Sequence, residues 1–324
     1  MIKPYLSIIV VGRNDNYCDG FMYRVQRFYD NLTYLLEKYK IPTEIIFVEW
    51  NPPKENKRVF QVIKLSKRRK YVSFRFLEVN QKVHLKEGGT EKLPLLEAKA
   101  KNVAIRRAKG KFIVCTNPDV IFNEELVNRI ARMDLKTDSF YRTARYELDK
   151  IIPTEIETSK LSEYCKKNYY SIFGMKYVWL KPRLSKNFLL NFPKILIRAI
   201  WHFILRNFRP NKYEYMNVHG GAPGDFTLMS KEDWMKIRGY PEINVQGSID
   251  GYNVSAAYAS GIKMVILEKK QRIYHQFHEY HGRKLFDFNK YRMEISNWIK
   301  NKKNPLYNKN YWGLKGIKLR EKVF

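Results

Sequence analysis

The chain has 324 residues, of which 61 are Lys or Arg and 32 are Asp or Glu, so its formal net charge is +29. A hydrophobic share of 44% and an aromatic share of 15% can fill a core, which excludes a disordered or low-complexity protein. The three Cys have no paired spacing, so neither a disulfide framework nor a Cys-based zinc site is expected, and a reducing compartment is favoured.

Apolar runs and helical periods alternate along the first 120 residues. The runs Leu6–Val11 and Glu44–Glu49 are typical of strands buried on both faces. Further strands are predicted at 71–78 and 111–115, and helices at 21–40 and 93–108. Strands that alternate with helices predict a parallel sheet between helices. The first residues lack the apolar run of a signal peptide, and no spanning helix is predicted.

Polar clusters follow three of the predicted strands. They are the segments 12–15 (GRND), 49–51 (EWN) and 116–119 (TNPD). Ligands of parallel sheets bind at the carboxyl ends of the strands, so these clusters are expected to meet at one edge and to form a site.

The second half of the chain contains a glycine-rich loop and a group of histidines. Residues 218–226 (VHGGAPGDF) predict a tight loop before the strand Phe226–Met229, which brings backbone close to a ligand. A helix is predicted at 231–239, and Asp250 precedes an Ala-rich helix at 253–260. Beyond a strand at 263–267, residues 274–281 (YHQFHEYH) hold three of the six His.

In this order, the segments SIIVVGRND, EIIFVEWNPP, AKAKNVAIRRAKGKFI and VCTNPDVIF resemble the GT-A class of nucleotide-sugar-dependent glycosyltransferases. The resemblance covers roughly residues 6–127 and 217–283. It implies an α/β fold with a single GT-A-like domain, in which helices flank a Rossmann-like mixed sheet. A basic helical insertion and a C-terminal helical tail are expected in addition.

The resemblance matches Asn117-Pro118-Asp119 to the DxD motif of that class, with Asn117 in place of the first Asp. It implies that Asp119 binds a divalent cation on the donor diphosphate, and that Thr116 and Asn117 lie beside the donor. The alternative is that this tripeptide is only a turn that closes a strand.

Other donor contacts are implied on the first strands and on the helix at 93–108. Gly12, Arg13 and Asn14 match the loop that surrounds the nucleoside, and Glu49 matches an acid that contacts the nucleobase. Asn102 and Arg106, four residues apart on one helix face, are predicted to reach the strand edge. The alternative is that the basic residues of this helix simply face solvent. These residues are Lys99, Lys101, Arg106 and Arg107.

Two acids are candidates for chemistry with the acceptor. Asp225 matches the loop under the donor sugar and acceptor, although it could simply cap a turn. Asp250 matches the general base of inverting members, although a carboxylate at a helix start is often a cap. We predict Asp250 as the base, with Asp225 second.

The histidines are candidates for further cation ligands, because the resemblance implies a His ligand beyond the last core strand. Imidazole is the commonest transition-metal ligand, and a site with Asp119 alone is short of protein ligands. His275 or His278 is therefore predicted to bind the metal, and His281 to contact phosphate or solvent. A His ligand favours Mn²⁺ over Mg²⁺. Separate zinc binding by the cluster is disfavoured because Cys ligands are missing.

The surplus positive charge is regional. Residues 160–212 carry twelve basic residues against one acid, and residues 283–324 carry twelve against three, which together account for 20 of the 29 charges. Segment 187–209 predicts a helix that is apolar except for polar and basic residues along a single face. Such a helix is typical either of a segment that docks on an anionic membrane or of a helix packed in the core. We expect a cytoplasmic protein that associates peripherally with such a membrane.

The expected division is a nucleotide-sugar-binding half (1–130), a basic helical insertion (131–212), an acceptor and catalytic half (213–282) and a basic tail (283–324). The predicted function is metal-assisted transfer of a sugar from a UDP- or GDP-linked donor to a glycan or lipid-linked acceptor. The alternatives are a basic nucleic-acid-binding protein, although no such motif is present, and a nucleotidyltransferase, which would need two metal-binding carboxylates.

Overall fold

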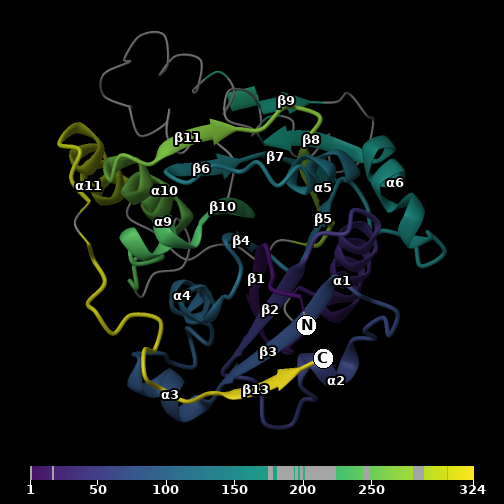
Figure 1. Cartoon of the computed structure of the whole chain (residues 1–324), viewed down its shortest axis with the longest axis horizontal. Coiled ribbons are helices and arrows are strands. Elements are labelled where there is room, and N and C mark those ends of the chain that lie inside the picture. Colours follow the sequence, from purple (N-terminus) through teal and green to yellow (C-terminus); the bar gives the residue numbers. More distant parts are fainter. Residues whose placement is uncertain are drawn as a thin grey trace.

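The computed structural model describes residues 2–16, 18–173, 178–180, 224–243, 249–279, 288–304 and 306–324, with isolated positions between 193 and 200. Two β-sheets and their helices make up these residues (Figure 1). Among them, no helix is both long enough and apolar enough to cross a membrane. The expected α/β architecture, a mixed sheet flanked by helices, is confirmed.

The larger sheet has eight strands in the order β11-β6-β10-β4-β1-β2-β3-β13. Its strands are β1 (Leu6–Gly12), β2 (Thr43–Trp50), β3 (Val72–Val79), β4 (Phe112–Thr116), β6 (Ser139–Arg142), β10 (Phe226–Ser230), β11 (Lys263–Ile266) and β13 (Arg320–Val323). Strands β1, β2, β3 and β4 are mutually parallel, whereas β10 runs antiparallel to both β4 and β6.

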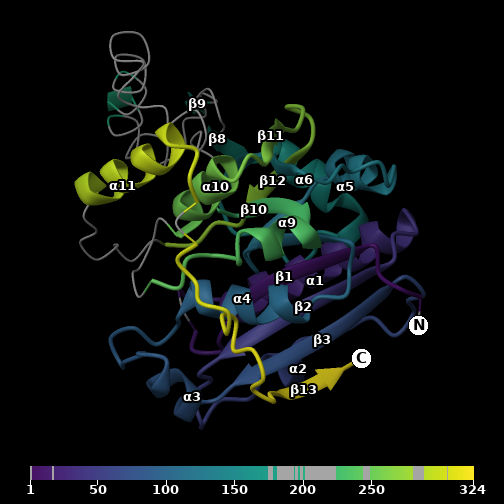
Figure 2. The same ribbon diagram turned by 60° about the vertical axis from the view of Figure 1, so that its left-hand side comes forward.

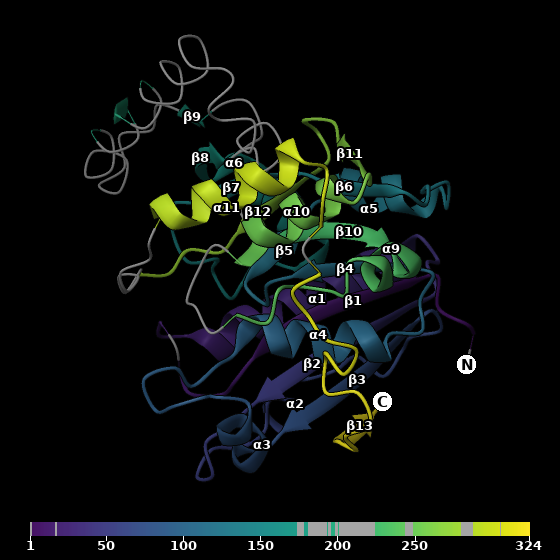
Figure 3. The same ribbon diagram turned by 90° about the vertical axis from the view of Figure 1, so that its left-hand side faces the viewer.

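Both faces of the parallel strands are buried, which explains the continuous apolar runs of the sequence. In β1, Ile9 and Val11 join one hydrophobic cluster, and Ile8 and Val10 join the cluster on the opposite face. Helix α4 (Glu97–Arg107) covers the first face and α1 (Phe21–Lys38) the second (Figure 3). The residues that directly follow these strands, such as Arg13 and Asn51, are less buried than the strands themselves.

The remaining helices are short or belong to the second half of the chain. They are α2 (Val59–Val62), α3 (Gln81–Lys86), α5 (Glu124–Ala131), α6 (Leu161–Lys167), α9 (Lys231–Lys236), α10 (Ile249–Ala259), α11 (Phe288–Lys300) and the 3₁₀ turn η1 (Thr158–Lys160). Helices α9, α10 and α11 place residues in the same hydrophobic cluster as α4. The N-terminus of α10, where Asp250 lies, therefore belongs to the α4 side of the large sheet.

A second sheet of five strands has the order β5-β12-β7-β8-β9. It consists of β5 (Val120–Phe122), β7 (Ala144–Leu148), β8 (Tyr169–Phe173), β9 (Val178–Leu180) and β12 (Arg272–His275). Strand β5 follows β4 almost directly, so the predicted diphosphate loop, residues 116–119, connects the two sheets.

Segment 131–212, expected to be a helical insertion, contributes four strands in addition to η1 and α6 where it is described. Strand β6 lies within the large sheet, and β7, β8 and β9 make up most of the small one. These strands are short, and β6 and β7 contain charged residues, so their sequence lacks the long apolar runs of β1 and β2. The apolar helix predicted at 187–209 lies outside the described residues, apart from isolated positions.

The segment after α11 folds back along the body of the protein (Figure 2). Past Asn304 it contains no further helix in its described residues, and β13 pairs antiparallel with β3. The side chain of Arg75 on β3 joins Glu321 of β13 at 2.6 Å and Glu44 of β2 at 2.7 Å. Only the first part of the expected helical tail is therefore helical among these residues.

Candidate functional site

The carboxyl ends of β1 and β2 border a cleft of about 550 Å³. Its walls include Arg13 after β1, Asn51 after β2, and Pro94 before α4. Arg13 and Asn51 both donate hydrogen bonds to the Pro94 carbonyl, at 3.2 and 3.3 Å, and Arg13 also pairs with Asp15 at 3.0 Å. These hydrogen bonds hold the ends of β1 and β2 and the segment before α4 together around a cleft that is large enough for a ligand.

Asp119, His275 and His278 lie together at the end of β4. The Nε2 atoms of both imidazoles are 3.4 Å from Asp119 Oδ2. In each ring Nδ1 has another partner: Glu147 Oε2 at 2.9 Å for His275, and the Glu279 carbonyl at 3.0 Å for His278. Because carboxylates and carbonyls accept hydrogen bonds, Nδ1 of each ring carries the proton and donates it, which turns Nε2 toward Asp119.

These three residues fit a divalent cation. Their ligand atoms all lie within 4.8 Å of one another. Asp119 Oδ1 is buried and has no hydrogen-bond partner among the described residues. Burial of an acceptor without a partner costs free energy, and a bound cation would provide that partner. One carboxylate and two imidazoles form a mixed donor set that suits Mn²⁺, Fe²⁺ or Zn²⁺ better than Mg²⁺, which prefers oxygen ligands.

The electrostatics of the triad reflect its charged surroundings. Burial raises the pKa of Asp119, but the two imidazoles outweigh burial and hold it well below its usual range. Burial lowers the pKa of His275, but the carboxylates of Glu147 and Asp119 raise it to about 10. Carboxylates therefore lie on both sides of the His275 ring, a setting that also favours a bound cation.

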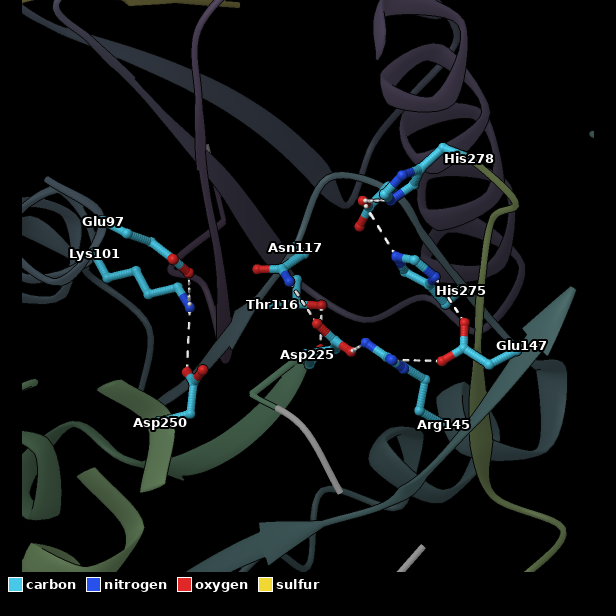
Figure 4. A network of polar contacts seen from close by, with 11 residues as sticks. Glu97, Lys101, Thr116, Asn117, Arg145, Glu147, Asp225, Asp250, His275 and His278 are labelled. Carbon is cyan, nitrogen blue, oxygen red and sulfur yellow. Dashed lines mark hydrogen bonds and ion pairs between the residues drawn. The ribbon is translucent and has the colours of Figure 1, made fainter. Parts of the chain in front are cut away.

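A chain of ion pairs continues from His275 into the large sheet (Figure 4). Glu147 Oε1 forms an ion pair with Arg145 at 2.5 Å, and Arg145 also pairs with Asp225 Oδ2 at 2.5 Å. The other oxygen of Asp225 accepts from the Asn117 side chain. Neither Arg145 nor Glu147 was predicted from the sequence. Their alternation in β7 (ARYEL), which places both on one face of the strand, is the signal that could have indicated them.

Asp225 is held as part of this network. Its residue is 2% exposed, both carboxylate oxygens have partners, and its carbonyl accepts from Thr116 Oγ1 at 2.5 Å. The predicted pair Thr116 and Asn117 thus contacts Asp225 directly. A carboxylate held in this way can fix the loop at the start of β10, but it offers little surface to an acceptor hydroxyl.

Asp250 lies in the first turn of α10 and retains some exposure, with a side chain 20% accessible. A Cβ atom at Gly224 would overlap its carboxyl group, so the glycine is what allows the loop before β10 to touch Asp250. Asp250 therefore lies directly against the loop that contains Gly224 and Asp225. It is the more accessible of the two predicted catalytic acids.

Lys101 on α4 faces Asp250 from the interior. Its side chain is fully buried, with Nζ 3.4 Å from Asp250 Oδ1, 2.7 Å from Glu97 Oε1 and 5.0 Å from the centre of the Tyr240 ring. Burial lowers the pKa of Lys101, but the carboxylates of Asp250 and Glu97 raise it well above its ordinary value. The solvated face considered for the basic residues of this helix is therefore wrong for Lys101, which belongs to the site.

Asn102 and Arg106 are not brought to the strand edge. The amide of Asn102 donates to the Tyr240 carbonyl at 2.8 Å and to Glu242 at 3.0 Å, and its oxygen accepts from the Tyr240 N–H at 2.7 Å. Arg106 donates to the carbonyls of Trp312 and Asn310. Both residues therefore hold neighbouring segments of chain in the described structure, and their predicted donor contacts are not supported by this placement.

Only some of the residues predicted to surround the nucleoside border the cleft. Gly12 ends β1 and Arg13 lines the cleft, whereas the Asn14 side chain donates to the Lys57 carbonyl at 2.8 Å. Glu49 is 2% exposed, and its carboxylate accepts the Val59 N–H at 3.0 and 3.2 Å. The acid at the end of β2 thus lies beneath the start of α2, away from the lining of the cleft.

Replacing Glu49 with Gln is expected to change how stability depends on pH. Burial raises the pKa of Glu49 to about 7 from 4.5, so the unfolded chain ionises this group more readily than the folded one. The folded state consequently loses up to about 3 kcal/mol as the pH rises from 4.5 through 7. We expect Glu49→Gln to be more stable than the parent at pH 8, with little of this gain at pH 4.5.

Urea unfolding at both pH values measures this difference. Glu55→Gln, at an exposed glutamate of the same region, is the matched control and should change the stability at neither pH. An effect of Glu49→Gln that is equal at pH 4.5 and 8 would contradict the burial argument.

No family model matches the chain, and no curated protein sequence matches it. Among solved structures, the chain is similar to TarS of S. aureus, with 13% identity, a TM-score of 0.44, and coverage of 84% of this chain and 36% of that chain. It is also similar to residues 1–349 of TarS in complex with UDP-GlcNAc, with 13% identity, a TM-score of 0.46, and coverage of 92% and 72%. It is similar as well to GalNAc-T7 with UDP, GalNAc and Mn²⁺, with 11% identity, a TM-score of 0.46, and coverage of 85% of this chain and 43% of that chain.

These neighbours are glycosyltransferases, the class that the sequence motifs resemble. The chain spans about a third of the length of the TarS chain of the first comparison. With TM-scores below 0.5, the likeness carries no argument about activity, so the function is derived below from this chain's own residues.

Proposed function

We propose that this chain transfers a sugar from a nucleotide-sugar donor to an acceptor hydroxyl. The observation that carries the proposal is the placement of the Asp119–His275–His278 triad at the carboxyl end of β4, in a sheet whose neighbouring strand ends border the cleft. A cation site and a cleft at the same edge of a parallel sheet suit a nucleoside diphosphate, because ligands bind such sheets at this edge.

The donor nucleoside is assigned to the cleft between β1, β2 and α4. Arg13 and Asn51 line it, and the backbone after Gly12 borders it. A guanidinium and an amide can hydrogen bond to the ribose or the base of either UDP or GDP. The carbonyl of Pro94 keeps both side chains in place, so this part of the site is organised before a donor arrives.

Asp119, His275 and His278 would hold a divalent cation, with Mn²⁺ favoured over Mg²⁺ because two ligands are imidazoles. When bound, such a cation compensates the charge that develops on the leaving diphosphate. Asn117 lacks a charge and instead binds Asp225. Its amide therefore fixes the loop between β4 and β5, and Asp119 supplies the carboxylate of the cation site.

Asp250 is proposed as the general base. The acceptor oxygen forms a bond to the anomeric carbon, the bond from that carbon to the diphosphate breaks with its electron pair leaving on the diphosphate, and the acceptor proton passes to Asp250. Lys101 Nζ lies 2.7 Å from Glu97 Oε1 and 3.4 Å from Asp250 Oδ1, so its charge is shared between the two carboxylates. Asp250 can then be oriented by Lys101 and still accept a proton.

Asp225, the second candidate for this role, is proposed to position the loop. Its two oxygens are committed to Arg145 and Asn117, and its side chain is 3% exposed. These contacts support Asp250 over Asp225 as the base.

The acceptor is proposed to be a glycan or a lipid-linked sugar, reached at an anionic membrane surface. The residues on which this idea depends, 187–209, lie outside the described part of the chain, so membrane docking stays a prediction. Sedimentation with anionic vesicles measures it separately from catalysis.

The donor and cation sites are tested by calorimetric titration of UDP and of GDP, with and without Mn²⁺. We expect one of the nucleotides to bind the parent chain at least about tenfold more tightly with Mn²⁺, which is 1.4 kcal/mol. In Asp119→Ala the effect of Mn²⁺ should disappear. Asp138→Ala is the control, because the Asp138 side chain is 75% exposed and pairs only loosely with Lys236 at 3.7 Å.

Two results would contradict the proposal. One is that neither nucleotide binds, while single-stranded RNA binds with a steep dependence on salt, as a nucleic-acid-binding protein would. The other is that Mn²⁺ strengthens nucleotide binding equally in the parent and in Asp119→Ala, which would remove the triad from the site.

A further inference from the structure

We propose that Glu147 is the positioning residue that aims the His275 imidazole for cation binding, and that Arg145 fixes Glu147 in this role. The proposal rests on the proposed function, because it assigns the cation to the same triad. Glu147 contacts the His275 imidazole, so its proposed effect is exerted through His275.

The pairing of strands in the small sheet brings these residues together. β12 pairs with β7 in parallel, and in this register His275 lies opposite Glu147. On its other side β12 pairs with β5, where His275 lies opposite Val120, the residue after Asp119. Gln276 N–H also donates to the Asp119 carbonyl at 2.9 Å. Three adjacent strands thus set the order Glu147, His275, Asp119.

The contact between Glu147 and His275 sets which ring nitrogen can bind a cation. Glu147 Oε2 lies 2.9 Å from Nδ1, so Nδ1 donates to Glu147, and Nε2, which faces Asp119, is the nitrogen left to bind a cation. A carboxylate behind a ligating imidazole also makes that imidazole a stronger donor to a metal. Without Glu147, the ring could rotate or exchange its proton between nitrogens, and both changes lose the ligand.

Arg145 explains how a glutamate can be held in this place. Glu147 has a side chain only 9% exposed, and an unpaired carboxylate at that depth would be costly. Arg145, two residues earlier on the same face of β7, pairs with Glu147 Oε1 and leaves Oε2 for the imidazole. The same guanidinium pairs with Asp225, which links the small sheet to the start of β10 (Figure 4).

A purely structural ion pair is the competing explanation. It predicts that loss of Glu147 lowers the stability of the chain and leaves its affinity for a cation unchanged. A suitable reference is Glu44, which is 1% exposed, pairs with Arg75 at 2.7 Å and belongs to β2 of the large sheet, whereas Glu147 belongs to β7 of the small sheet.

The experiment is a titration of the full chain with Mn²⁺ alone, followed by calorimetry or by the electron paramagnetic resonance signal of free Mn²⁺. In Glu147→Leu we expect the dissociation constant for Mn²⁺ to rise about 10- to 100-fold. In Glu147→Gln we expect a rise of only a few fold, because an amide oxygen can still accept the Nδ1 proton. In Glu44→Gln stability should fall while the dissociation constant stays at the parent value.

The outcomes separate this inference from the proposed function. If the parent chain binds no Mn²⁺, the cation site itself is contradicted. If the parent binds Mn²⁺ and both Glu147 variants bind it equally well, Glu147 is only structural and the inference is overturned. Should Glu147→Leu fail to fold, Glu147→Gln and Arg145→Lys carry the test, since each keeps a hydrogen-bonding group in place.

Discussion

Asp250→Asn is expected to lower the rate of sugar transfer about 100- to 10,000-fold, the usual contribution of a positioned general base. Asparagine keeps the shape of the side chain and can still accept a hydrogen bond from Lys101, but it cannot take up the acceptor proton. Binding of the donor nucleotide should be unchanged, because Asp250 belongs to α10 and does not line the cleft.

Transfer from UDP- and GDP-linked sugars and nucleotide affinity are measured on the same preparation. Asp233→Asn is a matched control, because Asp233 is also an acid in the first turn of a helix and accepts from Ser230 at its N-terminus. We expect Asp233→Asn to lose stability and keep its transfer rate. If Asp250→Asn instead keeps full activity with a similar loss of stability, Asp250 is a helix cap and the proposed base is wrong.

Trp312→Ala is expected to lower the free energy of unfolding by about 3 to 5 kcal/mol, as is usual when a large buried aromatic side chain is removed. Trp312 is 3% exposed, with the Arg106 guanidinium 4.1 Å from its ring centre. Gly239 lies so close that a Cβ there would be 2.8 Å from the ring. The variant would leave a cavity and an arginine without its aromatic partner.

Tyr311→Ala is the control for this change. Tyr311 is the preceding residue and is also aromatic, but it is 65% exposed, so its removal should cost less than about 1 kcal/mol. Urea unfolding of both variants measures the difference. Equal stability of the two would mean that the segment after α11 contributes little to the body of the protein.

The docking of this segment changes how the basic tail is understood. Arg107 donates to the carbonyls of Gly313, Leu314 and Ile317, and β13 extends the large sheet next to β3. In its described part the tail is therefore a structural element of the fold. Lysines of this region that remain at the surface can still contribute to an anionic partner, but their backbone is fixed.

The parallel half of the fold was predictable because both faces of its strands are buried. Runs such as 6–11 and 44–49 are continuous and apolar, and the helix at 21–38 was expected within two residues of its end. The small sheet was not predictable in the same way. Strand β7 alternates Arg145 and Glu147 with apolar residues over only five positions, so it lacks the continuous apolar run that marks β1 and β2.

Residue chemistry predicted the members of the triad better than helical spacing predicted the donor contacts. Asp119, His275 and His278 are groups that bind metals, and the structure brings them together. On α4, Lys101 and Asn102 are both fully buried, because the helix is covered on more than one side. The spacing of Asn102 and Arg106 shows which residues share a face, but not which neighbour that face contacts.

The position of β4 has a consequence for synthesis of the chain. It lies between β1 and β10, and its partner at 226–230 follows roughly 110 residues later. At about 5 to 20 residues per second, a ribosome needs roughly 5 to 20 seconds to make that stretch. During this time β4 has an open edge of unpaired backbone groups, which can capture strands of other nascent chains. Expression at reduced temperature or with a chaperone should therefore improve the yield of folded protein.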